Sequence, residues 1–334
     1  MGTCDRHDIS LLSRILARGR GVEDFFRAAA LRAGRFAPAK LHCRAMGRNT
    51  TKERPKSSRR KSRRKKAKKG WRTAATSDRH ELYELSVQEP EAECDLIDQV
   101  WKEQRRRKCN HIREDFCGTA AVAIEWVKRK KSHTSIGVDL DREVLDWARD
   151  KLPQRLDAEQ QSRVTIIEGN VLTTKTEKVD SVLAMNFSYN LFKTRDDLRN
   201  YFRIARESLV DDGLFLLDAY GGSEAFEELT EDRDLDGFTY VWDQASYDPI
   251  SGLATNHIHF HFPDGTKMKK AFSYEWRLWT LPEVQEILRE AGFKNVIVYW
   301  EGTDEETGEG DGEWSVAERG EACPGWVAYL VAER

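Results

Sequence analysis

The chain has 334 residues, of which 39% are hydrophobic and 34% charged, and its formal net charge at pH 7 is −2. This length can bury the core of one large or two modest domains, and because no apolar run reaches 18 residues, no membrane-spanning helix is expected. The charge is unevenly distributed: residues 1–72 hold 23 Lys and Arg against 5 Asp and Glu, which leaves 32 basic and 52 acidic residues for the rest.

Residues 1–76 are predicted to form a largely disordered basic arm, because residues 52–72 are Lys, Arg and Ser with almost no apolar side chains. Such a segment suits a nuclear or nucleolar address or a contact with RNA or another polyanion, and a solvated linker is the alternative. Residues 10–37 are Arg-rich and could form the helix of a mitochondrial or plastid transit peptide, although nearby acidic residues argue against it. We expect an intracellular protein and leave its compartment open.

Residues 77–334 are predicted to form one α/β domain, because short apolar segments alternate with segments of helical periodicity. The expected strands are residues 111–115, 135–141, 164–170, 179–187 and 213–220. The expected helices between them are residues 119–131, 142–152 and 195–209. This alternation predicts a doubly wound, mostly parallel sheet with helices on both faces, in which ligands bind at the carboxyl ends of the strands.

The pattern changes after the fifth strand. Residues 238–279 alternate with period two, which predicts an antiparallel β meander inserted into the sheet topology. A capped helix is expected at residues 280–293. Two final strands, residues 295–302 and 325–333, flank an acidic, glycine-rich loop at residues 303–313 that we expect to be mobile.

The loop after the first strand reads "EDFCGTAA" and lacks the three glycines of a dinucleotide-binding loop. It resembles the loop of the class I S-adenosylmethionine-dependent methyltransferases, in which an acidic strand end precedes x-G-x-G-x-G. Glu114 takes the acidic place, while Phe116, Gly118 and Ala120 take the places of the glycines. The loop residues that the resemblance assigns to the cofactor are Glu114, Phe116, Cys117, Gly118 and Thr119.

The following strand ends extend the resemblance. Asp139 matches the acidic residue that holds the ribose hydroxyls, and a carboxylate suits this role because it accepts two hydrogen bonds. Leu140 would lie against the adenine, while Asn170 and Val171 would contact its amino group and ring edge.

The resemblance covers about residues 80–333 apart from the meander, and the phrases "REDFCGTA", "NFSY", "DAYGGSEA" and "YEWRLWTLPE" are similar to those of an uncharacterised subgroup of this family. It implies a Rossmann-like methyltransferase fold with a seven-stranded sheet and S-adenosylmethionine as cofactor. Asn186 and Phe187, at the end of the fourth strand, would line the methyl-transfer pocket beside the cofactor.

The sequence gives weaker evidence for the site of the methyl acceptor than for the cofactor site. The segment Asn186-Phe-Ser-Tyr189 is similar to the [DN]-P-P-[YF] motif of amino-group methyltransferases but lacks both prolines. In the alternative interpretation, Asn186 and Ser188 satisfy backbone groups beside the cofactor. A general base is useful where the acceptor carries a proton, and Asp218 or Tyr220 is the candidate. The candidate catalytic residues are Asn186, Tyr189, Asp218 and Tyr220.

Other chemistry-bearing residues are ambiguous. The meander aromatics could cage a cationic amine or could simply form a core, and Tyr83 could cover the cofactor as a lid. His257, His259 and His261 alternate along one strand, but no carboxylate pattern accompanies them, so no metal is expected. The six cysteines form no CxxC pair, which predicts neither a zinc site nor a disulfide framework and fits a reducing compartment.

Three functional hypotheses remain. The first is a methyltransferase for a small molecule, which the acidic body favours because it would repel nucleic acid. The second is an RNA or protein methyltransferase whose basic arm docks the substrate. The third is a non-catalytic assembly factor with the same fold, which the reduced glycine content of the loop permits.

Overall fold

The computed structural model describes residues 72–303 and 310–334. The predicted disorder, targeting and polyanion contacts of the basic arm up to residue 71 lie outside these ranges, as do residues 304–309 of the acidic loop. In the described ranges, no helix is long and apolar enough to cross a membrane.

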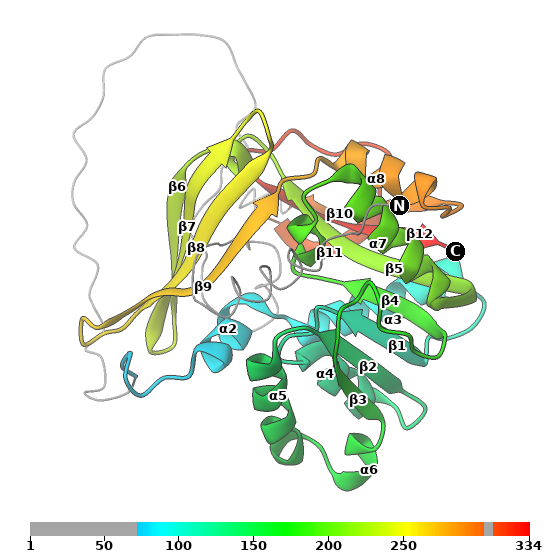
Figure 1. Cartoon of the computed structure of the whole chain (residues 1–334), viewed down its shortest axis with the longest axis horizontal. Coiled ribbons are helices and arrows are strands. Elements are labelled where there is room, and N and C mark those ends of the chain that lie inside the picture. The colour runs from blue at the N-terminus through cyan, green and yellow to red at the C-terminus, as the bar shows by residue number, and fades with distance from the viewer. Residues whose placement is uncertain (1–71, 304–309) are drawn as a thin grey trace, which may run out of the picture.

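The centre of the protein is an eight-stranded sheet (Figure 1). Its strands, in spatial order, are β3 (Val164–Glu168), β2 (Thr134–Asp139), β1 (His111–Asp115), β4 (Val179–Ala184), β5 (Leu209–Gly221), β12 (Trp326–Glu333), β10 (Val296–Thr303) and β11 (Gly310–Val316). The first five pair in parallel, and the last three pair antiparallel with their neighbours. Because the chain crosses from β3 to the other side of β1, the strand order reverses between β1 and β4, where ligands bind in such sheets.

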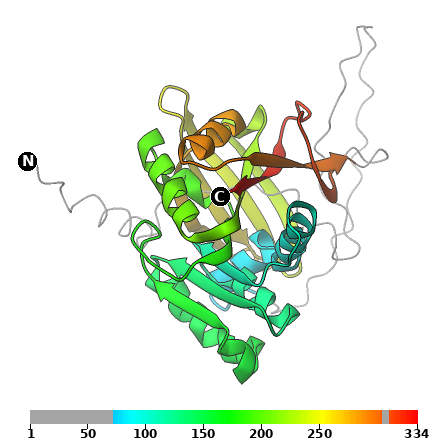
Figure 2. The ribbon, with the colours of Figure 1, turned by 90° about the vertical axis from the view of Figure 1, so that its right-hand side faces the viewer.

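Helices cover both faces of this sheet, as Figure 2 shows. The helices are α2 (Arg79–Val87), α3 (Pro90–Gln104), α4 (Ala121–Arg129), α5 (Arg142–Arg155), α6 (Ala158–Gln161), α7 (Arg195–Glu207) and α8 (Leu281–Glu290). Alternation along β4 separates the two layers: Leu183 packs with α3 and α4, whereas Val182 and Ala184 pack with α7 and α8. The doubly wound α/β architecture predicted from the sequence is therefore confirmed.

A second, four-stranded antiparallel sheet stands over one end of the parallel strands (Figure 1). Its strands are β6 (Leu229–Leu235), β7 (Phe238–Asp248), β8 (Leu253–His261) and β9 (Lys267–Arg277). Strand β9 contacts η1 (Ser188–Leu191), which follows β4, so the meander covers the carboxyl end of β4. A shared apolar cluster joins the meander to α2, to Phe187 after β4 and to Tyr220 on β5.

Two boundaries differ from the prediction. The main sheet has eight strands rather than seven, because residues 310–316 pair with β10, although residues 303–313 were expected to be a loop. The indole of Trp314 packs on the ring of Tyr329 at a centroid distance of 4.5 Å, which compensates for the low strand propensity of the surrounding glycine and acidic residues. The meander begins at Leu229 rather than at residue 238, because β6 pairs with β7. The sequence did not indicate this strand, because β6 is rich in charged residues and half exposed.

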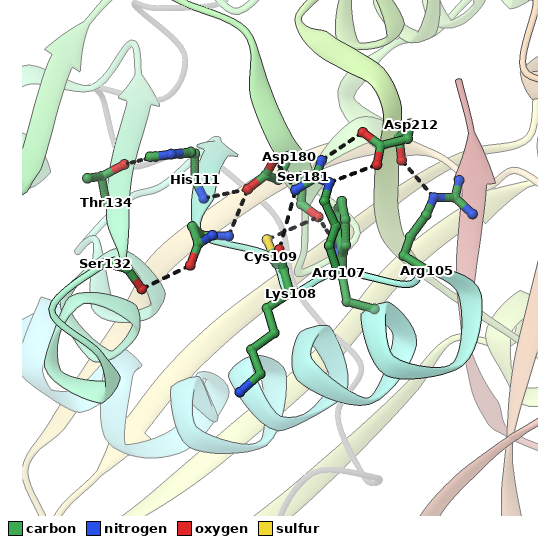
Figure 3. A network of polar contacts seen from close by, with 12 residues as sticks. Arg105, Arg107, Lys108, Cys109, His111, Ser132, Thr134, Asp180, Ser181 and Asp212 are labelled. Carbon is green, nitrogen blue, oxygen red and sulfur yellow. Dashed lines mark hydrogen bonds and ion pairs between the residues drawn. The ribbon is translucent and has the colours of Figure 1, made fainter.

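A polar network fixes the amino ends of β1 and β4 (Figure 3). The buried Asp180 carboxylate accepts hydrogen bonds from Arg107 at 2.8 Å and from the backbone N–H groups of Asn110 and His111 at 2.7 and 3.0 Å. Arg107 also donates to Asp212 through two nitrogens. This network lies at the amino ends of the strands, away from the carboxyl ends where ligands are expected to bind. Its role is to hold β1 and β4 in register.

Candidate functional site

The loop after β1 has an unusual backbone conformation. Phe116, Gly118 and Ala120 have φ values of 61°, 49° and 57°, all in the left-handed region that favours glycine. The loop therefore keeps a glycine-like backbone at all three motif positions although one residue of the three is glycine. Three N–H groups of the loop are used within the protein: that of Gly118 by the Asp139 carboxylate, and those of Cys117 and Ala120 by backbone carbonyls.

Apolar packing offsets the strain at the two non-glycine positions, which amounts to roughly 1–2 kcal/mol for each left-handed residue. The Phe116 ring lies 5.4 Å from the Tyr201 ring and 6.3 Å from the Phe192 ring, measured between centroids. Ala120 is fully buried in a small cluster of alanines. A Cβ added to Gly118 would meet no atom within 4 Å, so the loop is open at this position.

The side chains of Cys117 and Thr119 are turned away from this opening. Cys117 is fully buried, and its Sγ would lie 2.8 Å from a Cβ on Gly137, so its side chain requires the glycine there. The Thr119 hydroxyl donates to Gln88 Oε1 at 2.6 Å, which ties the loop to the segment after α2. The expected contacts of these two residues with a cofactor are therefore restricted to their backbone.

The carboxylate of Asp139 joins β2 to the same loop. Its Oδ2 accepts a hydrogen bond from the Gly118 N–H and its Oδ1 accepts one from the Asp141 N–H, both at 2.9 Å. Burial raises the pKa of Asp139, and these backbone N–H groups partly counteract that effect. The neighbouring Leu140 is 41% exposed, beside the half-buried Asp139.

Asn170 and Val171 follow the end of β3. Because β3 is parallel to β2, they lie at the same carboxyl end of the sheet as Asp139. Asn170 Oδ1 accepts a hydrogen bond from the Leu172 N–H at 2.9 Å, which shapes the turn. The Val171 side chain is buried, and its carbonyl accepts a hydrogen bond from Arg113 at 3.4 Å. Any contact of Val171 with an adenine ring must therefore involve its backbone rather than its side chain.

The two consecutive acids at the end of β1 have different environments. Asp115 forms a buried ion pair with Arg113 at 2.7 Å and accepts a hydrogen bond from the Tyr201 hydroxyl at 3.1 Å. Glu114 is 3% exposed and accepts one hydrogen bond of 3.3 Å, from the Ala123 N–H of α4. Burial raises the pKa of Glu114 to about 8. Glu114 thus has the character of a carboxyl group that a cationic ligand would ionise.

Asp218 on β5 braces the turn after β4. Its two carboxylate oxygens accept hydrogen bonds from the backbone N–H groups of Asn186 and Phe187, each at 2.8 Å. Asn186 and Phe187 have φ values of 59° and 54°, so the carboxylate holds two successive strained residues. Burial raises the pKa of Asp218 to about 7. This geometry favours a positioning role for Asp218 over the predicted role of general base.

The two candidate tyrosines are buried. Tyr189 is 1% exposed and its ring packs against Phe202 at a centroid distance of 6.0 Å, because the left-handed turn at residues 186–187 directs it into the core. This placement does not fit the expected stacking of Tyr189 on an acceptor. Tyr220 is 3% exposed, and its ring lies 4.8 Å from the ring of Phe187 under the meander.

The remaining candidates belong to the meander and to α2. Tyr83 packs on Phe272 at a centroid distance of 4.9 Å and is hydrogen-bonded to Tyr274, so it forms part of the wall between α2 and the meander. His257 lies 3.0 Å from Lys270 Nζ, and His259 lies 3.2 Å from an Asp243 oxygen. Across residues 72–303 and 310–334, no group of three His, Cys, Asp or Glu side chains could hold a metal ion.

Sequence reasoning missed two buried ionic residues near the site. Arg113 binds Asp115 and reaches the carbonyls of Val171 and Thr174, so it links β1 to the turn after β3. Glu93 lies on the buried face of α3, and its Oε2 has no hydrogen-bond partner. Helical spacing is the sequence signal that could have found Glu93 on the buried face, because the residues three and four positions after it are apolar.

Comparison of the sequence with known proteins gives one similar protein, a putative methyltransferase. No family model matches the chain. It is 26% identical to "Putative methyltransferase YqeM" of Bacillus subtilis (strain 168) over 212 residues, which are 62% of this chain and 82% of that protein.

Two solved structures are similar in fold. An S-adenosylmethionine-dependent methyltransferase from Clostridium acetobutylicum superposes with a TM-score of 0.56 at 16% identity, covering 76% of this chain and 96% of the other. The amino pentose methyltransferase CalS10 from Micromonospora echinaspora, solved with its S-adenosylmethionine bound, superposes with a TM-score of 0.54 at 18% identity, covering 76% and 95%. The chain therefore has the α/β fold of S-adenosylmethionine-dependent methyltransferases.

Proposed function

We propose that this protein is an S-adenosylmethionine-dependent methyltransferase that acts on a small molecule. The observation that carries the proposal is the left-handed loop at residues 116–120, whose Gly118 N–H binds the Asp139 carboxylate beside the exposed Leu140. A loop with a glycine-like backbone, an acid and an exposed apolar side chain, all at the carboxyl ends of β1 and β2, fit an amino-acid tail, a ribose and an adenine. The related Bacillus protein and the shared fold support the same activity.

Each group has a distinct task in this proposal. Asp139 accepts hydrogen bonds from the ribose hydroxyls, and Leu140 covers one face of the adenine. Asn170 and the Val171 backbone would hold the adenine edge, while Glu114 would pair with the ammonium of the methionine end. S-adenosylmethionine supplies an electrophilic methyl group on a sulfonium. The turn at residues 186–187, held by Asp218, positions the acceptor in line with it.

A small acceptor is favoured because the meander and α2 cover the carboxyl ends of β4 and β5. An apolar cluster joins the meander and α2 over these strand ends, which favours an acceptor small enough to be enclosed there. An RNA or protein acceptor would depend on the basic arm, whose predicted contacts and intracellular address remain predictions. The amino pentose substrate of CalS10 is an example of an acceptor of this size on the same fold.

The proposal is tested by calorimetry of the full chain with S-adenosylmethionine, followed by incubation of the labelled cofactor with fractionated cell extract. We expect one binding site per chain and label in the small-metabolite fraction. A folded chain that shows no binding at millimolar cofactor would instead support the assembly-factor hypothesis. Label in RNA that is lost as salt concentration rises would support docking through the basic arm.

The Glu114→Gln variant should remove a pH dependence of cofactor binding. In the free protein burial raises the pKa of Glu114 to about 8, and an ammonium partner lowers it, so binding below that pH releases a proton. The affinity of the unaltered protein for S-adenosylmethionine should therefore rise from pH 6 to pH 8. Calorimetry in buffers of different ionisation enthalpy measures the proton release, and an unchanged release in Glu114→Gln would contradict the assignment.

A further inference from the structure

Three lysines form a stripe on β9, which is an edge strand of the meander. Lys267, Lys269 and Lys270, here called the lysine stripe, are all exposed. Met268 belongs to the apolar cluster under the meander, so by the alternation of a strand Lys267 and Lys269 point to the opposite, outer face. Within the described part of the chain, no carboxylate forms an ion pair with any of the three ammonium groups. The lysine stripe is therefore available to an anionic partner.

The polar contacts of the stripe do not neutralise it. Lys270 Nζ lies 3.0 Å from His257 Nε2, and the ammonium group is the donor. Burial lowers the pKa of His257 to about 4, with a further contribution from the charge of Lys270, so the imidazole is neutral at pH 7 and accepts this bond. Asp264, the acid of the turn between β8 and β9, accepts two hydrogen bonds from Thr266, at 2.9 and 2.7 Å. The stripe thus presents its positive charge to solvent.

The basic arm enters the described structure beside the lysine stripe (Figure 1). The Ala74 N–H donates to the hydroxyl of Thr266, the residue before Lys267, at 3.0 Å. Residues 52–72, which precede this contact, hold 13 Lys and Arg against one acid. Two concentrations of like charge beside one another repel, and a polyanion that neutralises both relieves the repulsion and releases counterions. The arm and the stripe therefore act as one positive region.

The sign of the charge on β9 is not explained by protection of an edge strand. Charged side chains at an edge prevent pairing with another chain, and the opposite edge strand of the meander, β6, carries the exposed acids Asp232 and Asp234 for this purpose. The meander is thus positive at one edge and negative at the other. A narrow positive stripe fits one flexible chain of phosphates, whereas a flat anionic membrane would also meet the acidic edge.

We propose that the lysine stripe and the basic arm together bind the phosphate backbone of a single-stranded nucleic acid. The stripe lies on the outer face of the meander, and the inner face packs on Phe187 and Tyr220 at the carboxyl ends of β4 and β5. The nucleic acid is therefore a docking partner and not the methyl acceptor. This interaction is independent of the methyltransferase function proposed above, and it attaches an enzyme for a small molecule to a nucleic acid. Because phosphates carry no sequence information, the affinity depends on salt concentration rather than on base sequence.

The test is the fluorescence anisotropy of a labelled oligouridylate titrated with the full chain at several salt concentrations. We expect the Kd to rise steeply with salt. Lys267→Gln combined with Lys269→Gln should raise the Kd and reduce the slope of log Kd against log salt by about 1.4, because each phosphate contact of a single strand contributes about 0.7. Lys175→Gln combined with Lys178→Gln removes the same charge at exposed positions between β3 and β4. This control should leave the Kd and the slope unchanged.

A second measurement uses the unaltered chain. N-hydroxysuccinimide acetate labels exposed lysines, and mass spectrometry should show that the oligouridylate protects Lys267 and Lys269 but leaves Lys175 and Lys178 labelled. Absence of oligouridylate binding, equal salt slopes for the two double variants, or full labelling of Lys267 and Lys269 in the complex would overturn the proposal. Tighter binding to phosphatidylserine vesicles than to the oligouridylate would also overturn it, and would indicate a membrane as the partner.

Discussion

Asp139→Asn is expected to weaken S-adenosylmethionine binding by roughly a hundredfold, because hydrogen bonds to a charged acceptor are each worth about 1.5–3 kcal/mol. The carboxylate has an oxygen for each ribose hydroxyl and also accepts the Gly118 N–H at 2.9 Å. An amide replaces one acceptor by a donor, so in either orientation its NH₂ group faces a backbone N–H, that of Gly118 or that of Asp141. The variant therefore weakens both the ribose contact and the loop that receives the methionine end.

Calorimetric titration with S-adenosylmethionine measures this effect, and thermal unfolding verifies that the variant is folded. Asp150→Asn is the matched control, since Asp150 is exposed on α5, the helix that follows Asp139. Its affinity should equal that of the unaltered protein. Equal affinities of Asp139→Asn and Asp150→Asn would remove Asp139 from the cofactor site and with it the main support for the proposed function.

Asp218→Asn is expected to lower the free energy of unfolding by about 2–4 kcal/mol, because a buried acceptor of two backbone hydrogen bonds is replaced by an amide that can accept one. The lost bond leaves the N–H of Asn186 or Phe187 unsatisfied in a turn whose φ values of 59° and 54° are already strained. Relaxation of this turn should also lower kcat more than it raises the cofactor Kd, since the turn positions the acceptor.

The pH dependence provides a second measurement on the same variant. Burial raises the pKa of Asp218 to about 7, so the folded state binds its proton more tightly than the unfolded state, and this group's contribution to stability falls from about pH 4 to about pH 7. The Asp218→Asn variant lacks this pH dependence. Its free energy of unfolding should therefore fall furthest below that of the unaltered protein near pH 4 to 5. Chemical denaturation across this range tests it, with Asp211→Asn, an exposed position on β5, as the control. A destabilisation independent of pH would argue that Asp218 is ionised throughout.

The alternation of strands and helices along the chain, and with it the α/β fold class, could be predicted from the sequence. Apolar runs with period-two or helical spacing determine which segments become strands and helices, and these patterns are local. Asp139 and Gly118 were assigned to the cofactor through the resemblance to methyltransferase motifs, and this assignment stays a prediction. The strand β11 was missed because its glycines and acids have little strand propensity, and pairing with β10 determines its structure.

The backbone conformation and the burial of individual residues, in contrast, depend on contacts between segments that are distant along the chain. The sequence alone established a basic arm before an acidic α/β body and a loop with one glycine of three. Only the tertiary structure decided that Phe116 and Ala120 adopt the backbone of glycine, because the packing that offsets their strain comes from other elements, such as α7. It likewise turned Tyr189 into the core and buried Glu93 on α3, since burial is set by neighbours far apart along the chain.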